Sequence, residues 1–280
     1  MKLTSAQSEK IAKTLIWFAA LFVIGLLMFI IIYILVKGLP VINWQFLTDT
    51  PRSMGRTGGI SSTIIGTFMV TVLAIAIVIP FGIGTAFYLA EYTRETIVTR
   101  IIRFSAESLA GIPSIVYGLF GYLFFVIYLG LGWSVLSGGL TLAFMILPTV
   151  IRTSEEAILA VPHMYREASF SLSATKWQTI SRVVFPSAIL GIVNGIILSM
   201  GRCVAETAAV ILTAGSTLHM PSSVFSPTRT MAVHFYILAR EGISMENAYG
   251  TAALLILLIL LINVVANTLV NRFMAKAVKR

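Results

Sequence analysis

Residues 60–90, ISSTIIGTFMVTVLAIAIVIPFGIGTAFYLA, contain no charged side chain. This run is longer than the roughly 20 apolar residues that a transmembrane helix needs to cross the hydrocarbon core of a bilayer. It does not alternate polar and apolar residues, as the strand of a transmembrane barrel would. The segment therefore predicts a membrane-spanning helix that is either steeply tilted or kinked at Pro80, which lies beside Gly82 and Gly84.

The composition extends this prediction to the whole chain. Of its 280 residues, 58% are hydrophobic and 11% are charged, and the mean hydropathy is +0.94. A soluble domain carries roughly 25% charged residues, so this chain has too few to cover a water-facing surface. Because backbone groups in lipid must find their hydrogen-bond partners within the chain, the fold class is predicted to be an all-α polytopic membrane protein.

Five further apolar runs complete a prediction of six transmembrane helices. They cover residues 14–36, 112–131, 135–150, 183–212 and 251–270. The first run exceeds the 7–15 apolar residues of a cleavable signal peptide, so we expect it to be retained. Residues 91–103 are expected to form a short charged loop, and residues 215–250 a long loop with a surface helix near 231–238.

The positions of the basic residues predict the orientation, and they account for the net charge of +9. Six spans place both termini on one side, which would carry three Lys and Arg at the N-terminus, three in 91–103, four in the central segment and four in the tail. The opposite side would carry five, and Arg202 would lie within the membrane. Basic residues accumulate in cytoplasmic loops, so both termini and the central segment are predicted to be cytoplasmic.

The central polar segment, YREASFSLSATKWQTISRVVFP at 165–186, is flanked by apolar runs and predicts a surface for another protein. The chain contains no G-x-x-x-x-G-K-[ST] loop for nucleotide phosphates, so any energy for transport would come from a partner or an ion gradient. Its single cysteine and its three histidines (His163, His219 and His234) lack the spacing of metal ligands. We expect no catalytic residue, metal or cofactor in this chain, and we expect the histidines to be solvated loop residues.

Two charged residues interrupt the fifth predicted span. Arg202 and Glu206 stand four positions apart, a spacing that stacks side chains on one face of a helix. Each would cost about 2.5–3.5 kcal/mol near mid-membrane if unpaired. They are either a mutual clamp inside the bundle or part of an anion pathway, in which Glu206 would orient the forked guanidinium of Arg202. Arg152, close to Glu155 and Glu156, is a second pathway candidate, or else an anchor at the membrane interface.

The same span carries Gly191 and Gly195, which match the small-xxx-small pattern of closely packed membrane helices. The pattern fits a contact within the chain and a contact between two chains equally well.

The central segment resembles the EAA motif of ABC-importer permeases, E-A-A-x3-G-x9-I-x-L-P. The aligned residues are Glu167, Ala168, Ser169, Ser173 and the run 183–186, and the sequence departs from the pattern at Ser169, Ser173, Val183 and Phe185. Ser173 stands where the family usually has Gly, which permits a sharp turn after a short helix, so the geometry of this turn is an open question. The resemblance implies that Arg166, Glu167, Ala168 and Ser173 belong to a coupling helix that docks into a groove of an ATPase subunit.

Other segments look like phosphate-importer permeases of the PstA type. They are GIPSIVYGLFG at 111–121, VIRTSEE at 150–156 and R-x-x-x-E-T at 202–207, with Ala205 where the family usually has Gly. The resemblance implies a type I ABC importer permease fold with an N-terminal helix and first loop at 1–57 and a transmembrane domain at 58–280. It also implies that Arg152 and Arg202 match arginines implicated in phosphate passage.

The expected partners follow from the same resemblance. They are a second homologous permease, two ATP-binding subunits that hold ATP and magnesium, and an extracytoplasmic phosphate-binding protein, in the cytoplasmic membrane of a bacterium. A permease for sulfate, molybdate or phosphonate remains an alternative, and so does a secondary transporter driven by an ion gradient. No nucleic acid is expected as a partner.

Overall fold

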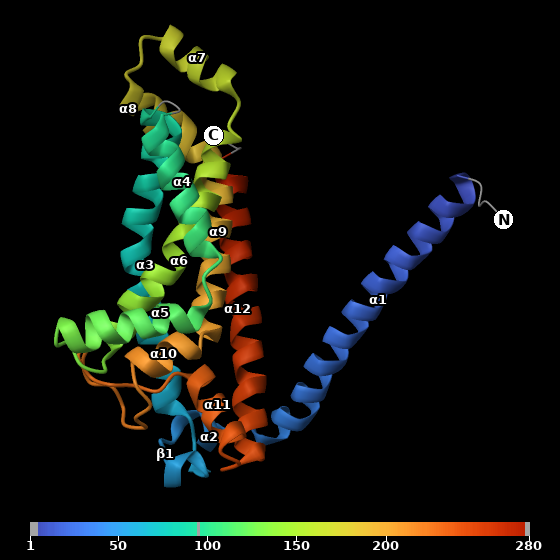
Figure 1. Cartoon of the computed structure of the whole chain (residues 1–280), viewed down its shortest axis with the longest axis vertical. Helices are drawn as coiled ribbons and strands as arrows, with labels where there is room; N and C mark the ends of the chain where they lie inside the picture. The colour runs from blue at the N-terminus through green and yellow to red at the C-terminus, as the bar shows by residue number, and fades with distance from the viewer. Residues whose placement is uncertain (1–4, 94–95, 278–280) are drawn as a thin grey trace.

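The computed structural model describes residues 5–93 and 96–277, and it is built mainly of long helices (Figure 1). The charge-free segment forms α3 (Ser61–Phe87), which continues into the π-helical turn η3 (Tyr88–Tyr92). The other long helices are α1 (Ser5–Gly38), α6 (Val135–Leu159), α9 (Phe185–Ala205) and α12 (Met245–Ala277). Five helical stretches built on these elements are long and apolar enough to cross a membrane.

Short elements gather at the two ends of this bundle. One end carries α7 (His163–Ser171), α8 (Lys176–Thr179) and the π-helical turn η5 (Ile180–Val184). The opposite end carries η1 (Leu39–Val41), α2 (Trp44–Thr48), β1 (Pro51–Arg52), η2 (Ser53–Gly55), β2 (Thr57–Gly58), α10 (Ala208–Thr213) and α11 (Met231–Arg240). The two strands pair antiparallel, with Pro51 opposite Gly58.

The predicted third span was wrong in its position and shape. Residues 97–110, most of which lie in or just after the expected charged loop, form helix α4 (Ile97–Ala110), which packs along α6. Helix α5 (Ser114–Gly121) and η4 (Tyr122–Tyr128) then turn away from α4 by 101° and lie across the bundle (Figure 1). Pro113 stands at this corner, and its fixed φ and missing N–H end the preceding helix. The bent pair is the sixth candidate span.

Helix α6 lies at the centre of the core. Leu142, Ile146 and Val150 are fully buried, and α3 packs along them, with Gly82 close against Val150. Helix α9 packs on the other side of α6. A β-carbon at Gly191 would lie 2.5 Å from Ala157, and one at Gly195 would lie 2.1 Å from Thr153. The two glycines therefore serve a helix contact within the chain, which decides between the two alternatives.

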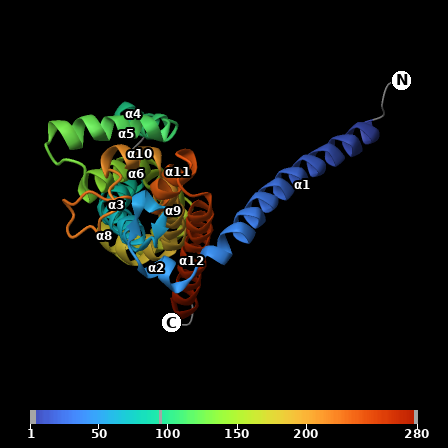
Figure 2. The same ribbon diagram turned by 90° about the horizontal axis from the view of Figure 1, so that it is seen from below.

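Helix α1 leaves the bundle. It contacts α12 only near its C-terminal end, where Gly38 approaches Tyr249 and Ala253 and the ring of Tyr33 meets that of Tyr249. The rest of the helix extends away from the other elements (Figures 1 and 2). Its most apolar window is 0% buried, so this chain alone provides no protein surface for it.

Helix α11 forms where a surface helix was expected, but it is buried. Met231, Val233, His234 and Leu238 are all 0% exposed. His234 is therefore not the solvated residue that the sequence suggested. The Arg229 guanidinium faces the Nδ1 atom of His234 at 3.4 Å, so this nitrogen is the acceptor and the ring is neutral. Burial, with a smaller effect of the Arg229 charge, lowers the pKa of His234 from 6.5 to about 4.

This lowered pKa predicts a loss of stability in weak acid. The unfolded chain binds a proton at this imidazole below about pH 6.5 and the folded chain does not, so the free energy of unfolding falls as the pH drops from 6.5 toward 4. We expect a loss of roughly 2 kcal/mol at pH 5 relative to pH 7.5. Thermal unfolding of the purified protein at the two pH values measures it. His234→Asn keeps an acceptor for Arg229 but does not titrate, and an equally steep pH dependence in that variant would contradict the assignment.

Candidate functional site

The α7–α8 hairpin of helices projects from one end of the bundle (Figure 1). It forms locally because Pro162 precedes α7 and because Thr175 begins α8 with a reciprocal capping box to Gln178. The hairpin exposes several large apolar side chains, namely Met164, Tyr165, Phe170, Leu172 and Trp177. Leu172 is 84% exposed. An apolar surface on so short an element is typical of a site for a protein partner.

Arg166 fixes this hairpin to the bundle. Its side chain is buried, and its Nε and NH2 atoms donate to Glu91 Oε1 of η3 at 2.9 and 2.7 Å. Its NH1 and NH2 atoms also donate to the carbonyl oxygens of Val161 and Ile158 at 2.6 and 2.9 Å. The guanidinium therefore joins α7, the end of α3 and the C-terminal end of α6. Arg166 was predicted to belong to the ATPase-coupling helix, and within the chain its side chain ties that helix to the bundle.

The remaining residues of the EAA-like motif divide into exposed and internal positions. Glu167 and Ala168 are exposed on α7. Ser169 contacts Thr179 of α8 through their hydroxyl groups, 2.9 Å apart. Ser173 has a φ of +59°, the left-handed conformation that glycine adopts without steric cost. The sharp turn of the motif therefore forms with Ser173, at a cost of about 1–2 kcal/mol.

Arg202 and Glu206 do not stack on one helix face, because α9 ends at Ala205. Glu206 has an extended backbone (φ −71°, ψ 129°), and its Oε1 accepts the backbone N–H of Ala209 at 3.2 Å, at the start of α10. The prediction of one continuous helix over 183–212 was wrong. Because Glu206 lies beyond the end of α9 and caps α10, the four-residue spacing does not place its carboxylate on the same helix face as Arg202.

Arg202 lies on an exposed face of α9, in line with Asn194 and Leu198 at intervals of four residues. In the part of the chain that the structure describes, no carboxylate forms an ion pair with it. Its guanidinium donors are therefore available to a ligand.

Arg152 occupies a charged cavity between α4 and α6, on the side of the bundle toward α7. Its Nε atom lies 3.0 Å from Glu156, and its NH1 atom lies 3.6 Å from Glu107 of α4. The cavity has a volume of about 250 Å³, and its charged lining consists of Arg103, Glu107, Arg152, Glu155 and Glu156.

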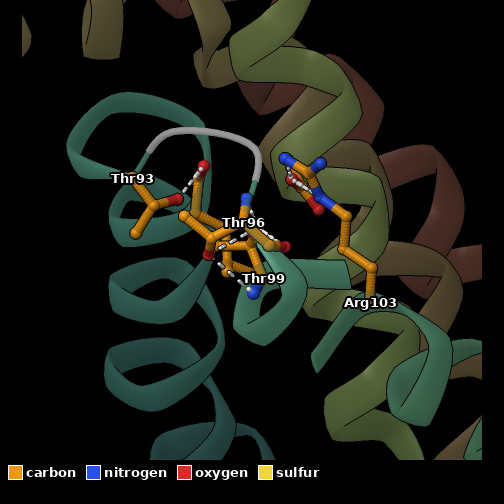
Figure 3. Close-up of polar contacts among 6 residues, drawn as sticks. Thr93, Thr96, Thr99 and Arg103 are labelled. Carbon is orange, nitrogen blue, oxygen red and sulfur yellow. Dashed lines mark hydrogen bonds and ion pairs between the residues drawn. The ribbon is translucent and has the colours of Figure 1, made fainter. Parts of the chain in front are cut away.

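Arg103 and Glu155 form the firmest contact between α4 and α6 at this cavity. The Nε and NH2 atoms of Arg103 both lie 2.8 Å from Glu155 Oε1 (Figure 3). Thr96 and Thr99 start α4 with a reciprocal capping box, which directs the helix so that Arg103 faces α6. Sequence reasoning missed Arg103 and Glu107, because it placed 91–103 in a loop and began the next helix only at residue 112. The helical spacing of the apolar residues Ile97, Ile101 and Phe104 was the available signal.

The two candidate pathway arginines lie at different depths. Gly195 of α9 packs on Thr153, the neighbour of Arg152, and Arg202 follows seven residues later. With a rise of 1.5 Å per residue, the two positions are about 10 Å apart along the bundle. They do not form one cluster, and they could bind an anion only in succession.

The family comparison identifies this architecture. Residues 78–279 match the family described as "Binding-protein-dependent transport system inner membrane component". The chain is a member of this family. It is therefore an inner-membrane, multi-pass permease component of an ABC transporter.

Relatives and solved structures agree with the membership. The "Probable ABC transporter permease protein YqgI" of Bacillus subtilis is 33% identical over 94% of this chain and 95% of its own length. The "Phosphate transport system permease protein PstA" of Xylella fastidiosa is 35% identical over 84% and 83%. A bacterial alginate ABC transporter superposes with a TM-score of 0.63 at 15% identity, covering 95% of this permease and 94% of that chain. The MetNI methionine transporter gives 0.61 at 19% identity, over 74% and 92%. These structures show the type I importer fold.

Removal of the Arg166 side chain should destabilise the permease. Arg166→Met would leave the Glu91 carboxylate buried and unpaired, and we expect a loss of about 3 kcal/mol in the free energy of unfolding. Glu91→Met together with Arg166→Met should recover part of this loss, because no buried charge remains unpaired. Denaturant titration of the purified variants in detergent measures both effects.

Arg152→Met is the matched control, since its ion pairs are exposed and should contribute little to stability. If Arg166→Met unfolds no more easily than this control, then Arg166 does not anchor the hairpin.

Proposed function

We propose that the chain is the membrane-spanning permease subunit of an ATP-driven importer of inorganic phosphate. The observation that carries the proposal is the exposed Arg202 on a helix apolar enough to span the membrane, without a carboxylate in ion-pair contact among the described residues. A guanidinium offers five N–H donors in a planar fork that matches the oxygens of phosphate. Relatives that carry the phosphate transport name support the choice of anion.

The α7–α8 hairpin is the proposed contact with the ATPase. An exposed helix with apolar side chains fits a groove on a partner, with Glu167 and Ala168 on its exposed surface. Since Arg166 ties α7 to η3 and α6, a displacement of α7 by the ATPase would be passed to both helices. The permease itself would hydrolyse nothing, and ATP with magnesium would be bound by the partner subunits.

The proposed assembly follows from the exposed surfaces. A second homologous permease would complete the pathway at the faces of α9, α4 and α5, and two ATP-binding subunits would lie at the α7 end. An extracytoplasmic phosphate-binding protein would dock at the end that carries α11 and the β1–β2 hairpin. Both termini would be cytoplasmic, in a bacterial inner membrane. The N-terminal end of α1 and the C-terminal end of α12 both point toward the α7 end of the bundle (Figure 1).

Transport through Arg202 would need weak binding, because a site on a pathway must also release its ion. Phosphate would exchange between the guanidinium of Arg202 and water, and the Arg152 cavity would receive it about 10 Å further on. There Glu107 and Glu156 compete for Arg152, which favours release toward the α7 end.

Arg202→Gln should lower phosphate uptake at least tenfold, because it removes a charge-assisted hydrogen-bond donor. Uptake of labelled phosphate by vesicles that contain the complete transporter measures this. Co-purification with the ATPase should persist, and Arg202→Lys, which keeps the charge but not the fork, should retain part of the activity. Unchanged uptake in Arg202→Gln would overturn the pathway role. Competition of the wild-type uptake by sulfate, molybdate or phosphonate as strong as that by phosphate would reassign the substrate.

Glu167→Lys tests the coupling surface separately. The reversed charge on the exposed face of α7 should weaken ATPase binding or abolish the stimulation of ATP hydrolysis by phosphate, without changing Arg202. Pull-down of the ATPase and phosphate-stimulated hydrolysis in vesicles are the measurements. Glu241→Lys, an exposed acidic residue at the opposite end, is the control. Normal binding and normal stimulation in Glu167→Lys would show that α7 is not the coupling helix, and uptake by this chain alone without ATP would favour an ion-driven transporter.

A further inference from the structure

A groove near the α7 end lies between α3 and the segment that leads into α9. Its lining residues are Ile83, Gly84, Phe87, Tyr88, Tyr92, Trp177, Ile180, Ser181 and Phe185, and its volume is about 590 Å³. The rings of Phe87 and Phe185 meet at its floor with their centroids 5.9 Å apart. A β-carbon at Gly84 would have no neighbour within 4 Å, so the groove is open along α3. Trp177 also belongs to the exposed surface of the α7–α8 hairpin, whereas the other lining residues have no part in the proposed transport cycle.

A π-helical turn contributes residues to each side of the groove. Tyr88 and Tyr92 bound η3, and Ile180 and Ser181 belong to η5. A π-helical turn inserts a residue into a helix and displaces its side chains, and such turns are frequent at functional sites. Residues of both turns line the groove.

The groove lies at the depth of the lipid headgroups. The stretches Ser61–Tyr92 and Lys176–Ala205 have 32 and 30 residues. At 1.5 Å per residue both exceed the roughly 30 Å of hydrocarbon by about 15 Å, so their ends extend into the interfacial layer. Tyr88, Tyr92 and Trp177 are at least half exposed at these ends, as is typical of the aromatic belt of membrane proteins.

The charge at the rim of the groove is positive. The Lys176 ammonium lies 4.9 Å from the centroid of the Tyr92 ring, and Arg182 is exposed on η5. Glu91, the acidic residue of η3, is neutralised by Arg166. The groove therefore combines an apolar floor and an aromatic rim with two cations that form no ion pair among residues 5–93 and 96–277. Helix α8 also lies on the opposite side of the bundle from α5, away from the proposed permease interface (Figure 2).

We propose that this groove binds an anionic phospholipid of the cytoplasmic leaflet, with an acyl chain on Gly84, Phe87 and Phe185 and the headgroup phosphate beside Lys176. The lipid assignment rests on the proposed orientation, with α7 in the cytoplasm, and not on the identity of the transported anion. Basic side chains near an anionic lipid surface favour it by about fivefold each. A lipid in this position wedges between η3 and η5, so it stabilises the spacing of the two elements that carry the α7–α8 hairpin.

Quenching of Trp177 fluorescence by brominated lipids tests the proposal. The complete transporter is placed in phosphatidylcholine vesicles with increasing fractions of brominated phosphatidylglycerol or, separately, brominated phosphatidylcholine. The signal of Trp177 is the difference between the wild type and Trp177→Phe. We expect half-maximal quenching at a lower fraction of phosphatidylglycerol than of phosphatidylcholine. Lys176→Gln should reduce this preference about fivefold, whereas Arg240→Gln, at the opposite end, should leave it unchanged.

Gly84→Phe should fill the groove and weaken quenching by both lipids, because it excludes the acyl chain. Gly25→Phe on α1, where a β-carbon also has no neighbour within 4 Å, is the matched control. Equal quenching by the two lipids in the wild type would overturn the proposal. So would quenching that appears only when the ATPase is absent, since the groove would then be part of a protein interface. The quenching of Trp177 does not depend on phosphate uptake, so this test can succeed or fail independently of the transport proposal.

Discussion

The buried guanidinium of Arg166 is the contact on which the α7 end of the permease depends. It lies where three elements meet, and it holds the carboxylate of η3 and two carbonyl oxygens from the C-terminal end of α6 and the residues after it. A charge this deep is tolerated only when it is fully hydrogen-bonded, and removal of either partner leaves an uncompensated ion. The short helix α7 has no core of its own, so these bonds hold it in a fixed position relative to the long helices.

The sequence predicted the elements whose determinants are local. The absence of charge over 60–90 predicts α3, and the EAA-like spacing predicts a short helix followed by a sharp turn, which Ser173 makes with a positive φ. It could not predict the bend between α4 and α5. In the sequence alone, the charges of Arg103 and Glu107 argue against a membrane span over this segment. The structure shows that both charges are paired with residues of α6. Such pairing joins residues about 50 positions apart, which no local pattern contains.

The same limit applies to the candidate pathway. The spacing of Arg202 and Glu206 indicated a pair because a continuous helix was assumed, yet Glu206 ends that helix and caps α10 instead. The break separates the two charges and leaves the guanidinium on an exposed face of α9. Arg202 is then a side chain whose electrostatic partner must come from outside the described residues, as a ligand, a second subunit or water. A mutual clamp, by contrast, would have made Arg202 unavailable.

Two sets of contacts join α7 to the bundle, and they reach different helices. Arg166 connects α7 to η3 and to the end of α6, whereas Ser169 connects it to Thr179 and hence to η5 and α9. The left-handed turn at Ser173 keeps α7 and α8 at a fixed angle, because few other backbone conformations close so short a connection. Through these contacts the hairpin is joined to η3, to the end of α6 and to η5, which leads into α9. Helix α6 carries Arg152 and α9 carries Arg202, so in the proposed transport cycle a movement of α7 driven by the ATPase would reach both arginines through packed helices.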